Sequence, residues 1–191
     1  MKKIGTFVIL LAYLLLAGCS KNNADPCENV SCLNGGTCAN GTCNCPEGFT
    51  GSDCSQEKTP TSMVIKSITV TKFSKTTSNG AGWDLTSGPD LTFVLVNKTK
   101  NTSYQHDKYI ENVTTTTAKF GNLELTVSPT DRYVIELYDY DLGLTNLIDP
   151  DDFMGGIDVS YLWDKGGKFP KKIALDAGGS VGFEFELIYK F

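Results

Sequence analysis

The chain has 191 residues, of which 40% are hydrophobic, and it carries 17 basic and 22 acidic side chains for a net charge of −5. Because an acidic protein is repelled by phosphate backbones, nucleic acid is disfavoured as a partner. The length is sufficient for a domain with a substantial hydrophobic core.

The N-terminus predicts export and lipid attachment. Residues 1–18 combine a short basic start with the apolar run Ile4–Leu16, which indicates a secretory signal peptide and is too short for a membrane span. The sequence "LAGC" that ends at Cys19 resembles a bacterial lipobox, which implies that Cys19 becomes a lipid-bearing N-terminus and that residues 19–26 form a tether. The membrane is then a partner through this anchor. Since Ser20 is not the acidic residue that retains some lipoproteins in the inner membrane, we predict a place in the bacterial cell envelope at the outer membrane.

Six further cysteines lie between Cys27 and Cys54, and none lies beyond them. An even number of cysteines in a short exported segment indicates three disulfides, although the spacing alone allows fifteen pairings. Zinc is the rival use of clustered cysteines, and an oxidising compartment with no histidine nearby disfavours it.

Residues 27–54, with "NGGTC" and "CNCPEGFTGSDC", resemble an EGF-like module. The resemblance implies the pairings Cys27–Cys38, Cys32–Cys43 and Cys45–Cys54. We expect the module to be a rigid spacer or a protein-contact module without an ion of its own. Residues 55–60, "SQEKTP", follow it as a polar linker.

Residues 61–191 predict an all-β domain. Short runs of alternating hydrophobic and polar residues are separated by Gly, Asn, Pro and Asp, and no helical period of hydrophobic residues occurs. This pattern predicts an antiparallel β-sandwich. The expected strands are 64–73, 91–97, 103–111, 123–128, 132–139, 154–159, 171–176 and 181–188.

Two groups of aspartates interrupt this domain. Asp84 and Asp90 precede the expected strand 91–97, and a second group follows strand 132–139, consisting of Asp139, Asp141, Asp149, Asp151 and Asp152. Together these groups resemble the calcium loops of a C2 domain, a β-sandwich that binds calcium through loops at one tip. The resemblance covers about 65 to 190 and implies an eight-stranded C2-like sandwich, with calcium as its cofactor. The implied ligands are Asp84, Asp90, Asp139, Asp141 and Asp152, and Asp149 or Asp151 could replace Asp152 because the second loop is longer than usual.

Elementary chemistry supports a calcium site without deciding it. Calcium takes six to eight oxygen ligands, and Asp139 and Asp141, two residues apart, would share one face of a regular strand. The alternative is that these aspartates are solvated turn residues, which is the usual role of aspartate at the start of loops.

Apolar residues accompany the predicted calcium loops. Those that could enter a lipid headgroup layer or the pocket of a partner are Trp83, Leu142, Leu144, Leu147 and Ile148, and the alternative is that they fold back onto the sandwich. We therefore predict a surface-anchored lipoprotein whose C2-like domain binds calcium and thereby mediates lipid or protein binding and adhesion.

Two other functions stay open. In a carbohydrate-binding β-sandwich, Trp83, Trp163 or tyrosines would form a sugar platform on a sheet face, and calcium would be structural or absent. In an accessory subunit of an envelope complex, no small ligand is needed. An enzyme is not expected, because no nucleophile motif or phosphate loop occurs and the single histidine, His106, is expected at the surface or on an edge strand.

Overall fold

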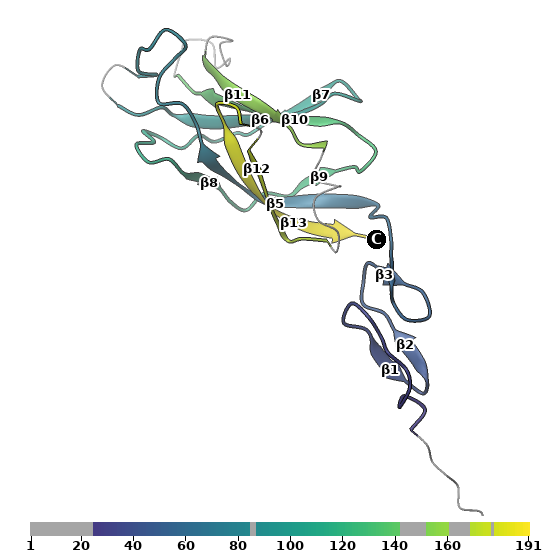
Figure 1. Cartoon of the computed structure of the whole chain (residues 1–191). Helices are drawn as coiled ribbons and strands as arrows, with labels where there is room; N and C mark the ends of the chain where they lie inside the picture. Colours follow the sequence, from purple (N-terminus) through teal and green to yellow (C-terminus); the bar gives the residue numbers. More distant parts are fainter. Residues whose placement is uncertain (1–24, 85–86, 142–151, 161–168, 177) are drawn as a thin grey trace, which may run out of the picture. The chain divides into compact units, whose positions relative to one another are not determined.

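A computed structural model describes residues 25–84, 87–141, 152–160, 169–176 and 178–191 (Figure 1). The chain divides into two compact units, Met1–Gln56 and Glu57–Phe191. Within the described ranges, no helix is long and apolar enough to cross a membrane.

The first unit is held by disulfides and two short hairpins. Strand β1 (Thr37–Ala39) pairs with β2 (Thr42–Asn44), and β3 (Phe49–Thr50) pairs with β4 (Gln56–Glu57), so β4 uses two residues of the predicted linker. Asn40 and Gly41 connect β1 to β2 with φ angles of 50° and 82°, the backbone that a two-residue hairpin turn requires. The disulfides are Cys27–Cys38, Cys32–Cys43 and Cys45–Cys54, the pairings that the EGF-like resemblance implies.

The second unit consists of two antiparallel sheets, and the expected all-β class is confirmed (Figure 1). The four-stranded sheet has the order β11 (Phe153–Asp158), β10 (Tyr133–Asp139), β6 (Leu91–Asn97), β7 (Thr102–Gln105). The other sheet has the order β12 (Lys172–Asp176), β13 (Gly182–Lys190), β5 (Ser62–Lys72), β8 (Ala118–Phe120), and β9 (Leu125–Val127) also pairs with β5.

One strand position differs from the sequence prediction. Strand β8 is not among the strands predicted from the sequence. Strands β8 and β9 pair with successive parts of the same edge of β5, so together they occupy one strand position in the sheet. Asn122, with φ of 55°, interrupts the position, and the Leu123 amide keeps the chain aligned by donating to the Lys66 carbonyl at 2.9 Å. The sandwich thus keeps eight strand positions, as the eight-stranded fold predicts.

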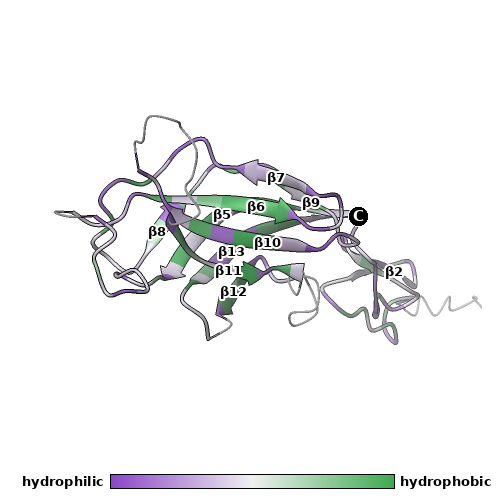
Figure 2. Ribbon diagram, turned by 90° about the horizontal axis from the view of Figure 1, so that it is seen from above, coloured by the Kyte–Doolittle hydropathy of each residue, from purple (hydrophilic) through white to green (hydrophobic). Residues whose placement is uncertain are grey.

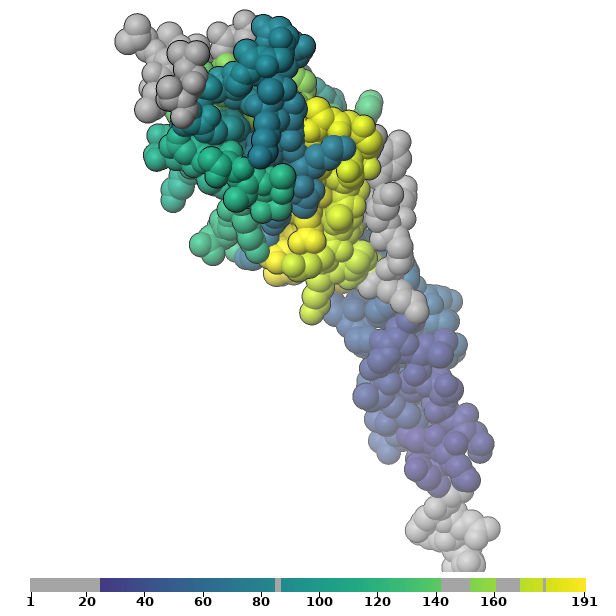
Figure 3. All heavy atoms as spheres, turned by 60° about the vertical axis from the view of Figure 1, so that its left-hand side comes forward, coloured from purple at the N-terminus to yellow at the C-terminus, as the bar shows by residue number. Residues whose placement is uncertain are grey.

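The core lies between the two sheets. It contains Phe93, Ile135 and Leu137 from the four-stranded sheet and Phe183 and Phe185 from the other, all without solvent exposure. Strand β6 is hydrophobic along most of its length, whereas β10 alternates between hydrophobic and hydrophilic residues because its outer face meets water (Figure 2). The first and last strands of the sandwich, β5 and β13, are neighbours, and Figure 3 shows the blue and yellow parts of the chain in direct contact.

Strand β7 is shorter than predicted because the chain bows away from β6. The His106 amide still donates to the Phe93 carbonyl at 3.0 Å, and Ile110 exchanges two main-chain hydrogen bonds with Leu91, each at 2.9 Å. Between these two positions the chain has three residues, 107–109, whereas β6 has only one, Thr92. The three residues arch over Thr92 and add two residues to this side of the ladder, as in a β-bulge.

Candidate functional site

The end of β10 places an aspartate at the edge of the core. Alternate residues of this strand face inward, and Asp139, the last of them, is only 1% exposed. Its Oδ1 accepts a hydrogen bond from the Asp90 amide at 2.7 Å, and the Tyr140 amide donates to the Asp90 carbonyl at 2.6 Å. The end of β10 is therefore fastened to the residue that precedes β6.

Three carboxylates gather at this point. One oxygen from each of Asp84, Asp139 and Asp141 lies within 4.8 Å of the other two. Asp84 is half-buried and its Oδ2 accepts from the Ser87 hydroxyl at 3.0 Å, whereas Asp141 is exposed. Within the described part of the chain, no lysine or arginine forms an ion pair with any of the three.

Burial and like charge act together on Asp139. Desolvation raises the pKa of this carboxyl to about 7, the Asp90 amide opposes the shift, and the charges of Asp84, Asp141 and Asp90 add to it. A divalent cation among the three carboxylates would favour the ionised form and reverse the shift.

Two other predicted ligands, Asp90 and Asp152, do not join this cluster. Asp90 contributes its main chain, while its Oδ1 accepts from the Asn112 amide at 2.7 Å. Asp152 precedes β11 and is not one of the three clustered residues. Asp149 and Asp151 lie outside the described residues. The expected shared strand face is also not the reason for proximity, because β10 ends at Asp139 and Asp141 lies beyond the strand.

Among the predicted contact residues, Trp83 folds back. Its indole packs against the core, and Nε1 donates to the Ser74 carbonyl at 2.8 Å. Trp163 and the apolar residues of the second loop, Leu142, Leu144, Leu147 and Ile148, lie outside the described residues.

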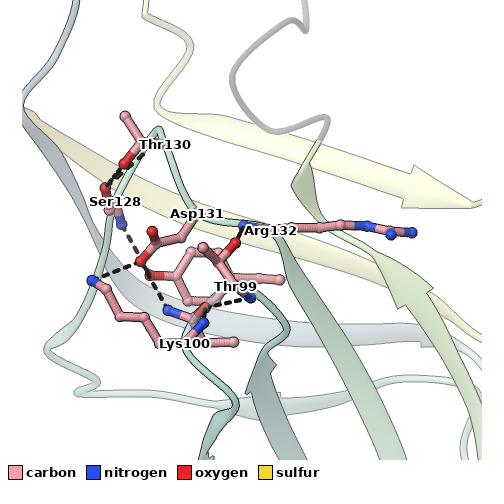
Figure 4. Close-up of polar contacts among 8 residues, drawn as sticks. Thr99, Lys100, Ser128, Thr130, Asp131 and Arg132 are labelled. Atoms are coloured by element: carbon pink, nitrogen blue, oxygen red, sulfur yellow. Dashed lines mark hydrogen bonds and ion pairs between the residues drawn. The ribbon is translucent and has the colours of Figure 1, made fainter.

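A second polar centre, not identified from the sequence, lies at the opposite end of the same strand pair (Figure 4). Asp131 is 7% exposed, and its Oδ2 lies 2.8 Å from Lys100 Nζ and accepts hydrogen bonds from Asn97 Nδ2 at 2.9 Å and the Tyr133 hydroxyl at 3.3 Å. The hydrogen bond from Lys100 is the largest of the effects that lower the pKa of Asp131. The only signal in the sequence is the turn "SPTD" at 128–131, in which the Ser128 hydroxyl accepts from the Thr130 amide.

His106 follows the edge strand β7, close to its expected place, but its side chain is only 11% exposed. The imidazole stacks on Phe93 with centroids 5.0 Å apart and meets Phe120 edge-on at 5.3 Å. Burial lowers the pKa of His106. The ring is therefore a packing element next to the arch at 107–109.

Comparisons with known proteins give short or distant similarities. No family model matches the chain. A stretch of 40 residues is 50% identical to the human hepatocyte growth factor activator serine protease, and the match covers 18% of this chain and 6% of the protease. The chain is also similar to a C2 domain of plant Extended Synaptotagmin 1, with a TM-score of 0.46 and 17% identity over 70% of this chain and 97% of that domain. Human GIVD cytosolic phospholipase A2 gives a TM-score of 0.40 and 12% identity over 68% of this chain and 17% of the phospholipase.

Proposed function

We propose that this protein is a lipid-anchored component of the bacterial cell envelope whose β-sandwich binds calcium at Asp84, Asp139 and Asp141. The bound ion would complete its coordination with anionic oxygens of a surface ligand, so that attachment depends on calcium. The observation that carries the proposal is the buried carboxylate of Asp139, which two further carboxylates approach and no described lysine or arginine neutralises.

The residues present fit calcium rather than a softer metal. All three side chains offer carboxylate oxygens, and the described cluster contains neither cysteine nor histidine, the ligands that zinc prefers. Three carboxylates provide fewer than the six to eight oxygens that calcium takes, which leaves positions for main-chain carbonyls, water or a ligand. The same two loops carry the resemblance to C2 domains, and extracellular calcium modules function at dissociation constants as weak as about 10⁻³ M.

Lipid anchorage rests on residues 1–19, which lie outside the described residues. The basic start, the apolar run and the "LAGC" sequence support it. Growth with an alkyne-labelled fatty acid tests it: the label should follow the wild-type protein and be absent from the Cys19→Ser variant. Equal labelling of both proteins would contradict anchorage at Cys19.

The calcium site is tested by calorimetric titration of the purified protein. We compare the wild type with the double variant Asp139→Asn/Asp141→Asn, and Asp176→Asn serves as the control because Asp176 is an exposed carboxylate of β12 away from the cluster. Calcium should bind to the wild type and to the control at millimolar or lower concentration and not to the double variant. Binding that survives in the double variant would contradict the assignment.

The anionic ligand could be a lipid phosphate or a carboxylate of another macromolecule. Co-sedimentation with vesicles of phosphatidylserine and phosphatidylcholine, with calcium and with EDTA, tests the first source. Binding to immobilised polyglutamate under the same two conditions tests the second. Calcium-dependent binding of the protein to the vesicles or to polyglutamate identifies which of the two ligands the ion bridges. Equal binding in calcium and in EDTA would contradict a bridging ion.

A further inference from the structure

The arch of residues 107–109 borders a small, partly open cavity at the edge of the four-stranded sheet. Its volume is about 210 Å³, and Thr92 of β6 is one of its lining residues. Gln105, His106 and the arch line it beside the edge strand β7, and Tyr140, just after β10, lines it as well. The Thr92 hydroxyl donates to the Lys108 carbonyl at 3.3 Å and ties the arch to the sheet.

Two tyrosines give the cavity an aromatic wall. The rings of Tyr109 and Tyr140 stack with centroids 4.6 Å apart and an interplanar angle of 25°, and both residues are half-buried. One ring comes from the arch and the other from the end of β10, so the contact closes the cavity between two separate segments. Such a wall offers an apolar surface bordered by hydroxyl groups.

The remaining lining offers hydrogen bonds without an excess of one charge. Asp107 and Lys108 contribute one charge of each sign. The side-chain amide of Gln105 and the hydroxyls of Tyr109 and Tyr140 make no hydrogen bond with other described residues. These groups can both donate and accept, so they can bind a ligand rich in hydroxyl groups.

We propose that this cavity binds a neutral sugar, one pyranose residue of a glycan, with the C–H face of the ring against the tyrosine pair and its hydroxyls toward Gln105 and Asp107. The proposal goes beyond calcium binding and does not depend on it, because none of the three clustered carboxylates lines the cavity.

The shape and chemistry of the cavity disfavour the other small ligands. An anion such as phosphate would meet Asp107 and the acidic residues near Tyr109. A drug-sized apolar ligand needs roughly 300 Å³ or more, which exceeds this volume. A single sugar ring presents an apolar face and several hydroxyls within a small volume, and this combination matches the lining.

Saturation-transfer-difference NMR on the whole purified protein tests the proposal. The probes are the methyl glycosides of glucose, galactose, mannose, N-acetylglucosamine and N-acetylgalactosamine, with phosphocholine and inorganic phosphate as rivals, all in EDTA. We expect saturation transfer to the ring protons of at least one glycoside at millimolar concentration and none to either rival.

Two variants and a control locate the binding. Tyr109→Ala removes half of the aromatic wall and should weaken binding about tenfold, because the apolar face of the sugar would lose one of the two rings that it contacts. Gln105→Ala alters an exposed side chain and should weaken binding by a factor of about 3 without affecting the fold. The control Phe153→Ala removes a 45% exposed ring of β11 that does not line the cavity, and binding should be unchanged.

Each other result overturns the proposal. If no glycoside receives saturation, the cavity does not bind a neutral sugar. If a glycoside binds equally to the wild type and to both cavity variants, its site is elsewhere. If phosphocholine or phosphate binds and the cavity variants abolish this binding, the ligand class is wrong. Because all samples contain EDTA, none of these results bears on the calcium site.

Discussion

Replacing Asp139 with asparagine should make the metal-free protein more stable at pH 8 and leave it nearly unchanged at pH 3. Asparagine keeps the oxygen that accepts from the Asp90 amide and removes the ionisable group. The folded state raises the pKa of Asp139 from 3.8 to about 7, so the folded protein binds this proton more tightly than the unfolded chain does. Folding stability must then fall as the pH rises from about 4 to above 7 and level off beyond that range.

The size of the effect follows from the pKa. The full difference corresponds to roughly 4 kcal/mol in the free energy of unfolding. Burial is the largest cause of the shift, and the neighbouring Asp141 is exposed. Water at the cluster therefore relieves part of the desolvation as well as the repulsion, and we expect about 1 to 2 kcal/mol at pH 8. At pH 3 this carboxyl is largely protonated in both the folded and the unfolded wild type, because their pKa values are about 7 and 3.8, and the two proteins should unfold together.

Urea unfolding followed by tryptophan fluorescence measures this difference, because Trp83 and Trp163 both belong to the second unit. The experiment is run in EDTA at both pH values and repeated with calcium, which should stabilise the wild type and not the Asp139→Asn variant. An equal difference in stability at pH 3 and pH 8 would refute the reasoning, since it would show that proton binding at Asp139 does not govern the change. A variant that calcium stabilises as strongly as the wild type would refute the assignment of the ligand.

Three further predictions concern the fold. The Ser67 hydroxyl and two lysines lower the pKa of Glu186 from 4.5 to about 2 in the folded protein, so this carboxylate stabilises the fold above about pH 4.5 and ceases to do so as the pH falls toward 2. Glu186→Gln should therefore make unfolding, followed by circular dichroism, less dependent on pH in this range. Gly155→Ala should lower the free energy of unfolding by roughly 1 to 3 kcal/mol in a thermal melt, because φ is 148° and the new Cβ would lie 2.3 Å from Ser180 Oγ. The control Gly121→Ala adds a Cβ with no atom within 4 Å and should leave the stability nearly unchanged. Since all three disulfides lie in the first unit, a reducing agent should unfold that unit and leave the tryptophan-detected melting of the second unchanged.

The strand pattern is predictable because burial imposes a period of two on the sequence. The sequence predicts a strand at 91–97, and β6 spans Leu91–Asn97, since its inward residues Leu91, Phe93 and Leu95 leave only one register. Strand β8 has only three residues, too few to display a period, and the arch after β7 keeps the composition of a strand while leaving the ladder. Both failures occur where pairing with a distant strand, rather than local pattern, decides the structure.

The candidate site is only partly predictable, for a related reason. The acidic runs identify Asp84, Asp139 and Asp141, but the sequence cannot distinguish a carboxylate that faces the cluster from Asp90, whose side chain accepts a local amide. Likewise, the position of Trp83 next to Asp84 is as consistent with exposure as with the packing it adopts. The direction of a side chain in a loop depends on tertiary contacts, which leave no period in the sequence.

Two buried aspartates at opposite ends of the β6–β10 pair show why the cluster at Asp139 calls for an external cation. Asp131 and Asp139 are 7% and 1% exposed, and each accepts hydrogen bonds from the protein. The pKa of Asp131 is lowered because Lys100 supplies a positive charge, whereas the pKa of Asp139 is raised because burial is reinforced by further carboxylates. A solvated turn aspartate would show neither burial nor this crowding. The fold thus neutralises one buried carboxylate with its own lysine and leaves the other with negative neighbours, and a bound calcium ion would compensate that charge.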